Sequence, residues 1–310
     1  MKKNILITGS GVLSAYVAKE FLKKGCNVII TSRHKKKNYK NFNFLRIEKK
    51  VIFVKLDLLN KKQIKKLIVK YSPESIFYFS GQSSLVKSLK LKESTHKSNF
   101  LGAKIFLQVL KERNLQTKFY KANSGYIFNP RNGLITLQSK FMKSNNPYIN
   151  SQIKAFKIVK KFRSEGLNCF SIVFLQVESP LRKKSFFIKK VCCSAKFGKF
   201  IKVGNIHTIR DYSWAPEVAS GIYYLSKTNI KDIILSSGKG ISGQKILEIA
   251  YNRKKLNYKK FYKINPNFVR KNEAPILIGY DKKMKILYQK FKWKPKIYGK
   301  KIVNLMYSSI

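Results

Sequence analysis

The segment Asn4-Ile5-Leu6-Ile7-Thr8-Gly9-Ser10-Gly11-Val12-Leu13-Ser14 decides the fold. A strand-like run, Asn4–Thr8, leads directly into a turn with two glycines, and an amphipathic helical pattern, Leu13–Lys24, follows. Glycines let the backbone turn tightly, and the free amides of a helix N-terminus favour an anion. The segment therefore predicts a loop that binds the pyrophosphate of a dinucleotide. Its expected contact residues are Thr8, Gly9, Ser10, Gly11, Val12 and Leu13.

Beyond this loop, apolar runs alternate with amphipathic helical stretches. The expected strands are Asn4–Thr8, Asn27–Thr31, Val51–Val54, Ser75–Phe79, Lys118–Lys121 and Cys169–Phe174. The expected helices are Leu13–Lys24, Lys61–Lys70, His96–Glu112 and Asn150–Ser164. Such alternation is typical of parallel strands joined by crossover helices. The sequence therefore predicts an α/β protein with a Rossmann-type, doubly wound parallel sheet.

The alternation stops after Glu178-Ser179-Pro180. A basic loop, a helical pattern over Phe186–Phe197, short strands and a second helical pattern over Gly243–Asn252 follow. We expect a dinucleotide-binding domain over 1–174 and a smaller α/β substrate-binding lobe over 175–310, with some elements of the lobe returning to the first domain. The stretch Arg33–Lys50 is expected to be a polar, lysine-rich loop.

The charge of the chain is extreme. Lys and Arg number 66 against 14 Asp and Glu, which gives a formal net charge of +52 over 310 residues. The lysines are spread along the chain, and many fall on the solvent face of expected helices, as in Lys61–Lys70. Arginine, the preferred reader of bases, is comparatively scarce, and no nucleic-acid-binding motif is present. We interpret the charge as a solvated surface and expect no specific nucleic-acid partner.

Other bulk features favour a cytoplasmic location. No apolar stretch approaches the roughly 20 residues that a membrane span needs. The N-terminus enters an expected strand almost at once, which leaves no signal peptide. Four cysteines, of which Cys192 and Cys193 are adjacent, form no metal-binding spacing and no evident disulfide framework, so we expect no metal and a reducing compartment.

The end of the second expected strand bears on the choice of dinucleotide. An acidic residue there would bind a ribose 2′-hydroxyl, but the chain has Ser32 and Arg33 instead. A hydroxyl and a guanidinium suit a 2′-phosphate, so NADP is favoured over NAD. The alternative is that Arg33 belongs to the general excess of basic residues. Two pairs at later strand ends are expected near the same ligand, namely Asp57-Leu58 near its adenine and Ser80-Gly81 near its middle.

A series of short motifs follows in a specific order along nearly the whole chain. They are Gly81-Gln82-Ser83-Ser84, Ser88, Lys118-Phe119-Tyr120-Lys121-Ala122, Pro147-Tyr148, Glu178-Ser179-Pro180, Val203-Gly204-Asn205, Arg210-Asp211, Arg270, Glu273, Leu277, Gly279 and Trp293-Lys294-Pro295. In this order the chain resembles GDP-mannose 4,6-dehydratases, which are extended short-chain dehydrogenase/reductases. The resemblance implies an NADP-dependent lyase that acts on GDP-mannose, a homo-oligomer (dimer or tetramer), and a role in supplying deoxysugars for surface polysaccharide.

The resemblance also implies a mechanism. A tyrosine removes the proton of the sugar 4-hydroxyl while a hydride passes from C4 to the nicotinamide. The resulting ketone acidifies the C5 proton, which a carboxylate removes; water leaves from C6, and the hydride returns to C6. Tyr148 matches the tyrosine, and Ser124 matches a hydroxyl residue that steadies the 4-oxygen.

Two catalytic positions depart from the family pattern. Gln152 stands four residues after Tyr148, where the family has a lysine that lowers the pKa of the phenol from about 10 and holds the nicotinamide ribose. Glutamine can hydrogen-bond the ribose but carries no charge. Tyr126 stands where the family has its carboxylate, and at neutral pH tyrosine is a far weaker base. Turnover is therefore expected to be impaired.

Residues that match the family's sugar-nucleotide contacts are better preserved. They are Ser83, Gln176, Glu178, Arg182, Lys190, Gly204, Arg210 and Arg270. Three hypotheses remain open from the sequence. The chain is a working enzyme, either a slow dehydratase or a related epimerase or reductase; or it is a non-catalytic paralogue that binds a nucleotide sugar; or, last in order, it binds nucleic acid through its charge.

Overall fold

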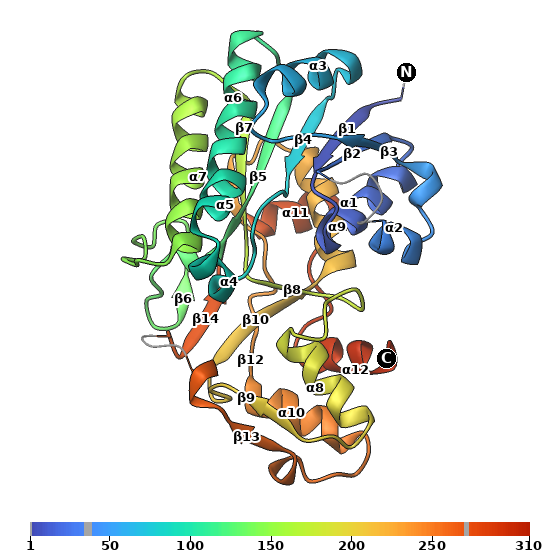
Figure 1. The fold of residues 1–310 in the computed structure, drawn as a ribbon, viewed down its shortest axis with the longest axis vertical. Helices are drawn as coiled ribbons and strands as arrows, with labels where there is room; N and C mark the ends of the chain where they lie inside the picture. Colours follow the sequence, from blue (N-terminus) through green and yellow to red (C-terminus); the bar gives the residue numbers. More distant parts are fainter. Residues whose placement is uncertain (1, 34–38, 270–272) are drawn as a thin grey trace. The chain divides into compact units, whose positions relative to one another are not determined.

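The computed structural model describes residues 2–33, 39–269 and 273–310. Two compact units are present (Figure 1). Unit 1 consists of Met1–Asn129, Lys140–Phe174 and Ala219–Ile233, and unit 2 of Pro130–Ser139, Leu175–Val218 and Ile234–Ile310. The chain therefore crosses between the units several times, and a late segment, 219–233, belongs to the unit built from the first half of the sequence.

Unit 1 is built on a seven-stranded sheet with the order β11-β7-β5-β4-β1-β2-β3. Its strands are β1 (Asn4–Thr8), β2 (Asn27–Ser32), β3 (Ile52–Lys55), β4 (Ser75–Tyr78), β5 (Lys118–Ser124), β7 (Cys169–Phe174) and β11 (Asp232–Ile234). The pairs from β3 through to β7 are all parallel. The strand order reverses between β1 and β4, which is the point where such sheets bind ligands at their carboxyl ends. The predicted doubly wound α/β fold is confirmed.

Helices cover both faces of this sheet (Figure 1). They are α1 (Val12–Lys23), α2 (Lys40–Phe44), α3 (Lys61–Tyr71), α4 (Leu85–Lys90), α5 (Lys92–His96), α6 (Gly102–Glu112), α7 (Pro147–Ser164) and α9 (Ala215–Ser226), of which the last begins in unit 2. On one face, Leu67 of α3, Phe106 of α6 and Val159 of α7 share one buried apolar cluster. On the other face, the Phe21 ring of α1 lies 5.2 Å from the Phe77 ring of β4. Burial of these faces is the main stabilising term.

Two expectations about local structure were wrong in detail. The expected loop over 33–50 contains α2 and a 3₁₀ turn, Glu48–Lys50, while residues 34–38 lie outside the described part. The cause is Phe42, which is fully buried and stacks edge-on against Phe53. The single helix expected over 96–112 begins earlier, with α5, and passes through a π-helical turn, Lys97–Leu101, before α6.

Unit 2 holds two small sheets. Its strands are β6 (Leu134–Ile135), β8 (Gln176–Glu178), β9 (Ile201–Val203), β10 (Ile209–Trp214), β12 (Gly240–Ser242), β13 (Tyr262–Ile264) and β14 (Ile276–Gly279). Its helices are α8 (Phe187–Lys196), α10 (Gly243–Asn252), α11 (Met284–Phe291) and α12 (Lys300–Ser308), with 3₁₀ turns at Tyr258–Lys260 and Pro266–Phe268. Val191, Leu247 and Val303 of α8, α10 and α12 form the centre of its core.

A buried carboxylate ties the larger sheet of unit 2 together. Asp211 on β10 accepts backbone hydrogen bonds from Ser237 (3.1 Å), Gly238 (2.9 Å) and Gly279 (3.3 Å). Burial raises the pKa of Asp211, and these hydrogen bonds oppose the rise. Asp211, one of the sequence motifs quoted above, thus has a structural role, because its carboxylate satisfies backbone donors that would otherwise be buried alone.

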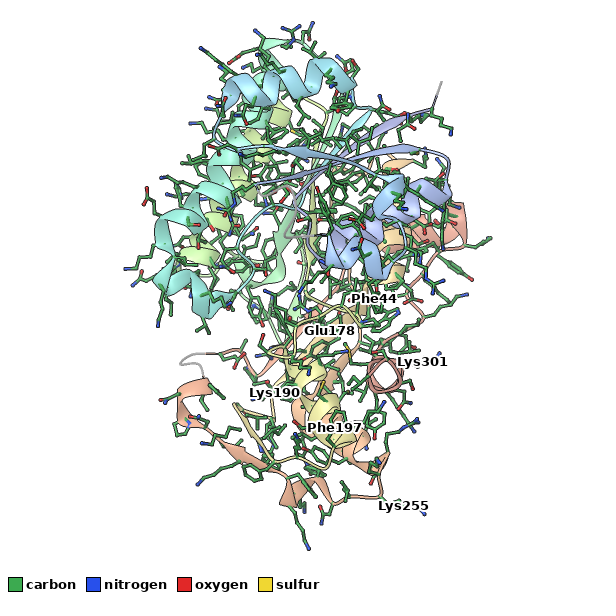
Figure 2. All side chains as sticks on the ribbon, turned by 45° about the vertical axis from the view of Figure 1, so that its right-hand side comes forward. Phe44, Glu178, Lys190, Phe197, Lys255 and Lys301 are labelled. Atoms are coloured by element: carbon green, nitrogen blue, oxygen red, sulfur yellow. The ribbon has the colours of Figure 1, made fainter. Side chains whose placement is uncertain are left out.

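The basic side chains lie mainly at the surface. Figure 2 shows Lys255 and Lys301 extending away from the ribbon, and both are exposed. This is the arrangement expected of a solvated charged surface. Within residues 2–33, 39–269 and 273–310, no helix is both long enough and apolar enough to cross a membrane.

Candidate active site

The glycine turn after β1 is held tightly against the neighbouring strand ends. Gly9 has a φ of +83°, and a Cβ there would lie 3.1 Å from Ser80 Oγ and 3.3 Å from Ser80 Cα. The Gly9 amide donates to Thr31 O (2.9 Å), and the Ser80 amide donates to Thr8 Oγ1 (3.1 Å). Both the conformation and the close approach require glycine. The turn is thereby fixed at the carboxyl ends of β1, β2 and β4.

The start of α1 suits an anion. Gly11 is the N-cap residue, no side chain caps the helix, and the first turn contains no acidic residue. A Cβ on Gly11 would meet nothing within 4 Å, so the space beside these amides is open. Free amides and the positive end of the helix dipole favour a diphosphate here. Val12 and Leu13 carry two of these amides, and Ser10, whose carbonyl accepts from Asn41 Nδ2 (3.1 Å), completes the loop.

The residues predicted to choose between NADP and NAD lie at the end of β2, and those predicted near the adenine follow β3. Ser32 closes β2 beside Lys55 of β3, and Arg33 follows it as an exposed side chain. Asp57 is exposed and accepts a hydrogen bond from the Leu59 amide at 3.0 Å. Leu58 is half-buried and packs beside Gly102 at the start of α6.

The helix that carries Tyr148 is anchored at its first turn. Asn146 is the N-cap of α7, and its Oδ1 accepts from the Tyr148 amide at 3.0 Å. The same oxygen accepts from Ser88 Oγ of α4 at 3.2 Å, and Asn146 Nδ2 donates to Leu85 O at 3.3 Å. Tyr148 itself is 8% exposed. Sequence reasoning missed Asn146, although an asparagine directly before a helix-starting proline is a recognisable N-cap signal.

A buried asparagine links the segment after β4, which lies next to the glycine turn, to helix α7, which carries Tyr148. Asn99, in the π-helical turn, is fully buried and donates to Gln82 O (3.2 Å) and to Ser151 Oγ (3.1 Å). Ser151 Oγ donates in turn to Tyr148 O at 2.8 Å. Gly81 has a φ of +155°, and a Cβ there would collide with Asn99 Oδ1. The Ser80-Gly81 segment and the Tyr148 helix are therefore built into one network inside unit 1.

The other predicted catalytic residues lie near that helix. Ser124 ends β5, is 7% exposed, and accepts a hydrogen bond at Oγ from the Tyr126 amide at 3.3 Å. Tyr126 is half-buried in the 3₁₀ turn Gly125–Ile127, which packs against α7. Gln152 is 7% exposed and lies one turn after Tyr148 on α7, so the two share a helix face. Unit 1 thus contains all four predicted catalytic residues.

A buried lysine on β5, Lys121, belongs to one of the sequence motifs but was given no role from the sequence. Lys121 is 1% exposed; its Nζ donates to Ala122 O and lies 5.4 Å from the centre of the Tyr78 ring. Burial lowers the pKa of Lys121 to about 7. The charged form of this lysine is therefore disfavoured inside the sheet.

Among the predicted substrate contacts of unit 2, the buried Glu178 pairs with the half-buried Arg182. Glu178, which is labelled in Figure 2, ends β8 and is 2% exposed. Its Oε2 lies 3.6 Å from Arg182 Nε. Burial raises the pKa of Glu178 to about 7, and the positive charges of Arg182 and Lys189 oppose the rise. The Arg182 guanidinium lies 3.4 Å from the centre of the Phe186 ring. Gln176 begins the same strand, in register with Tyr212 of β10.

Lys190 and Gly204 meet at the turn Pro266–Phe268. Lys190 Nζ donates to Lys202 O and lies 5.2 Å from the Phe268 ring, and burial lowers its pKa. A Cβ on Gly204 would lie 2.6 Å from Phe268 O, so only glycine fits there. Arg210 is 5% exposed, and its guanidinium forms an ion pair with Glu273 at 2.8 Å. Part of this guanidinium is therefore already paired within the protein. Ser83 is an exposed residue of unit 1, and Arg270 lies outside the described residues.

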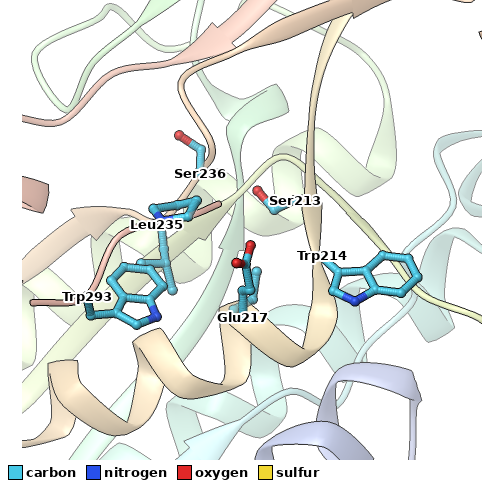
Figure 3. A pocket seen from close by; sticks show the side chains of 8 residues that line it. Ser213, Trp214, Glu217, Leu235, Ser236 and Trp293 are labelled. Atoms are coloured by element: carbon cyan, nitrogen blue, oxygen red, sulfur yellow. The ribbon is translucent and has the colours of Figure 1, made fainter. Parts of the chain in front are cut away.

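A small cavity in unit 2 is not a substrate site (Figure 3). It is lined by Ser213, Trp214, Glu217, Val218, Leu235, Ser236, Trp293 and Pro295. Its volume of about 10 Å³ holds about one water molecule. The Glu217 carboxylate accepts from the amides of Lys296 (3.0 Å) and Ile297 (2.9 Å), so its polar group holds the C-terminal segment in place.

The chain is similar in sequence to proteins of one known family over most of its length. The family model described as GDP-mannose 4,6 dehydratase matches residues 6–306. GDP-mannose 4,6 dehydratase 1 of Arabidopsis thaliana is 23% identical over 328 residues, covering 98% of this chain and 89% of the relative. The GDP-mannose 4,6-dehydratase of Yersinia enterocolitica is 22% identical over 268 residues, covering 80% of this chain and 71% of the relative.

Solved structures share the fold at lower identity. A UDP-glucose 4-epimerase from Thermotoga maritima, solved with UDP-glucose, superposes with a TM-score of 0.83 at 18% identity, covering 99% of this chain and 98% of the other. A dTDP-glucose 4,6-dehydratase from Bacillus anthracis, solved in complex with NAD, has a TM-score of 0.84 at 15% identity, covering 99% and 96%.

The doubly wound sheet and the glycine turn at its switch point define a Rossmann-type α/β protein with the fold of nucleotide-sugar epimerases and dehydratases. Because the family model spans nearly the whole sequence, the chain belongs to the GDP-mannose 4,6-dehydratase family. The resemblance inferred from the sequence motifs is confirmed, and a nucleotide-sugar dehydratase-like function follows from it.

Proposed function

We propose that the chain is an NADP-dependent lyase that converts GDP-mannose to GDP-4-keto-6-deoxymannose at a reduced rate. The observation that carries the proposal is the network inside unit 1. It links the glycine turn through Ser80 and Gly81 to Asn99, and Asn99 through Ser151 to Tyr148. A dinucleotide whose diphosphate binds at the start of α1 would extend along this network toward Tyr148. Membership of the family supports the substrate.

In this proposal the side chains of unit 1 perform the proton chemistry. A bound nicotinamide would supply the hydride-transfer chemistry at C4 and C6. Ser124 holds the sugar 4-oxygen, and Tyr148 takes the proton of the 4-hydroxyl. Gln152 donates to the ribose that bears the nicotinamide. Tyr126 occupies the position of the family's carboxylate, and because tyrosine is a weak base, the elimination is slowed as well as the oxidation at C4.

Further assignments extend the proposal. Residues 1–174 bind the dinucleotide, and residues 175–310 bind the sugar nucleotide. Gln176, Glu178, Arg182, Lys190, Gly204, Arg210 and Arg270, together with Ser83, are the proposed contacts to it. We also propose a cytoplasmic homo-oligomer, a dimer or tetramer. The four free cysteines fit a reducing compartment.

A second candidate function is that of an epimerase or reductase acting on a related sugar nucleotide. The observation that favours it is that Tyr126 stands where the family has its carboxylate, while Ser124 and Tyr148 are retained. Redox chemistry at C4 needs the tyrosine and the hydride acceptor but no C5–C6 base. Formation of a 4-epimer or a 4-reduced sugar, without loss of water, would identify this function.

Turnover of GDP-mannose with NADP tests the proposal. We expect slow formation of the 4-keto product, measured by mass spectrometry, and a loss of about 100-fold or more in Tyr148→Phe, since the phenolic oxygen is the base. Tyr223→Phe, which changes a tyrosine of α9, serves as the matched control and keeps the wild-type rate. A Tyr148→Phe variant as active as wild type would refute the role of Tyr148.

The choice of dinucleotide gives a separate prediction. NADP is expected to bind at least about tenfold more tightly than NAD, because Arg33 and Ser32 can hydrogen-bond a 2′-phosphate. Arg33→Ala removes most of this preference, whereas Arg113→Ala, an exposed arginine at the end of α6, leaves it unchanged. Calorimetric titration measures both affinities. Equal affinities of the wild-type chain for NADP and NAD contradict the prediction.

A further inference from the structure

We propose that Asn123 is a positioning residue that orients the Gln152 side-chain amide, so that Gln152 presents its NH₂ group to the dinucleotide. This inference rests on the proposed function, in which Gln152 lies beside the nicotinamide ribose. Asn123 on β5 and Gln152 on α7 face each other, and they are 4% and 7% exposed. Both lie in unit 1.

One unambiguous acceptor fixes the Asn123 amide. Asn123 Nδ2 lies 3.1 Å from the backbone oxygen of Gln152. A backbone carbonyl oxygen can only accept a hydrogen bond, so the Asn123 group that faces it must be the NH₂. The opposite rotamer would place two oxygens in contact inside the protein, at the cost of two lost hydrogen bonds. Asn123 Oδ1 consequently points the other way, where it is buried and accepts from no described residue.

The same NH₂ group then fixes Gln152. Asn123 Nδ2 also lies 3.3 Å from the Gln152 side-chain amide, and because Nδ2 donates, the atom that it faces must be Oε1. The NH₂ group of Gln152 is therefore turned away from Asn123. In the described part of the chain no acceptor is within hydrogen-bonding reach of Gln152 Nε2, which leaves it available to a ligand.

The need for Asn123 follows from the residue type at position 152. A lysine ammonium has three donors and no acceptor, so every rotation of it presents a donor. A glutamine amide presents a donor on one side and an acceptor on the other, so a half-turn reverses its chemistry. Asn123 removes that ambiguity. Asn123 should accordingly matter when residue 152 is glutamine and matter little when it is lysine.

A double-mutant cycle on dinucleotide binding tests this inference. Dissociation constants for NADPH and for its adenosine half, 2′,5′-ADP, are measured by calorimetry in wild type, Asn123→Ala, Gln152→Lys and the double variant. NADH and 5′-AMP are measured in parallel, so the result does not depend on which dinucleotide is preferred. We expect Asn123→Ala to weaken NADPH binding about five- to tenfold in the wild-type background and less than about twofold in the Gln152→Lys background. Binding of 2′,5′-ADP stays unchanged throughout.

The possible outcomes separate the two proposals. Equal losses in both backgrounds, or no loss in either, overturn the role of Asn123 and leave the proposed function intact. Failure of wild type to bind any of the four probes overturns the proposed function itself. If Asn123→Ala does not fold, Asn123→Leu replaces it, because leucine has a similar size and no NH₂ donor to hold Gln152 Oε1. Wild-type NADPH affinity in a folded Asn123→Leu variant would also overturn the inference.

Discussion

The combined replacement Gln152→Lys and Tyr126→Glu is expected to raise formation of the 4-keto product from GDP-mannose by about 100-fold or more. Lysine at 152, one turn after Tyr148, supplies the positive charge that favours the ionised phenol. Glutamate at 126 supplies a base that is ionised at neutral pH. The pH at which the rate reaches half of its maximum should move downward in the variant. Initial rates by mass spectrometry across pH 6 to 10 measure both effects.

The two single variants, and the paired variant without the Tyr148 hydroxyl, are the controls of this experiment. Gln152→Lys alone speeds the oxidation at C4, and Tyr126→Glu alone speeds the elimination, so each gives less than the pair. Adding Tyr148→Phe to the pair abolishes the gain, because the phenol is the group that the lysine serves. Wild-type turnover equal to that of the paired variant would contradict the expectation that Gln152 and Tyr126 limit the natural protein.

A carboxylate at position 11 is expected to weaken dinucleotide binding strongly. Gly11→Asp places a negative charge at the N-terminus of α1, within roughly 5 Å of the proposed diphosphate position, and at such distances near a protein surface the repulsion amounts to about 3 kcal/mol. That energy corresponds to about a 100-fold loss of affinity relative to Gly11→Asn, which has the same shape without the charge. Calorimetry with NADP and NAD measures the difference.

The structure indicates that neither change at position 11 disturbs folding. Gly11 has a φ of −72°, which any residue adopts, and a Cβ there meets no atom within 4 Å. Both variants should therefore melt within a few degrees of the wild-type protein. Gly9→Ala differs, because Gly9 has a φ of +83° and a close neighbour in Ser80. Equal affinities of Gly11→Asp and Gly11→Asn would show that the diphosphate binds elsewhere.

Sequence periodicity predicted the fold well because the sheet of unit 1 is buried on both faces. Its strands, such as Asn4–Thr8 and Cys169–Phe174, are short apolar runs whose bounds in the structure match the expected ones. The glycine turn could be placed because its residues are consecutive. Periodicity failed where burial is carried by isolated residues, as at Phe42, or where local backbone geometry departs from an α-helix, as at Lys97–Leu101.

The candidate site was predictable only as far as its residues lie in local motifs. Tyr148, Ser124 and the glycine turn were predicted in this way. Asn99 and Asn123 were missed because each acts through a partner distant in sequence, and Asn146 was missed although its N-cap position is a local signal. Asn99 bonds Ser151, Asn123 bonds Gln152, and Asn146 accepts from Ser88. Such pairings follow from how β5, α4 and the π-helical turn meet α7, and no spacing rule in a single sequence encodes them.

A crystal structure of the protein with bound NADP would show directly whether the turn after β1 and helix α7 hold one dinucleotide. We expect the pyrophosphate to accept hydrogen bonds from the backbone amides at the start of α1. We also expect Gln152 Nε2 and Tyr148 to reach the ribose that carries the nicotinamide. A dinucleotide bound away from the turn after β1, or one whose nicotinamide half lies remote from α7, would contradict it.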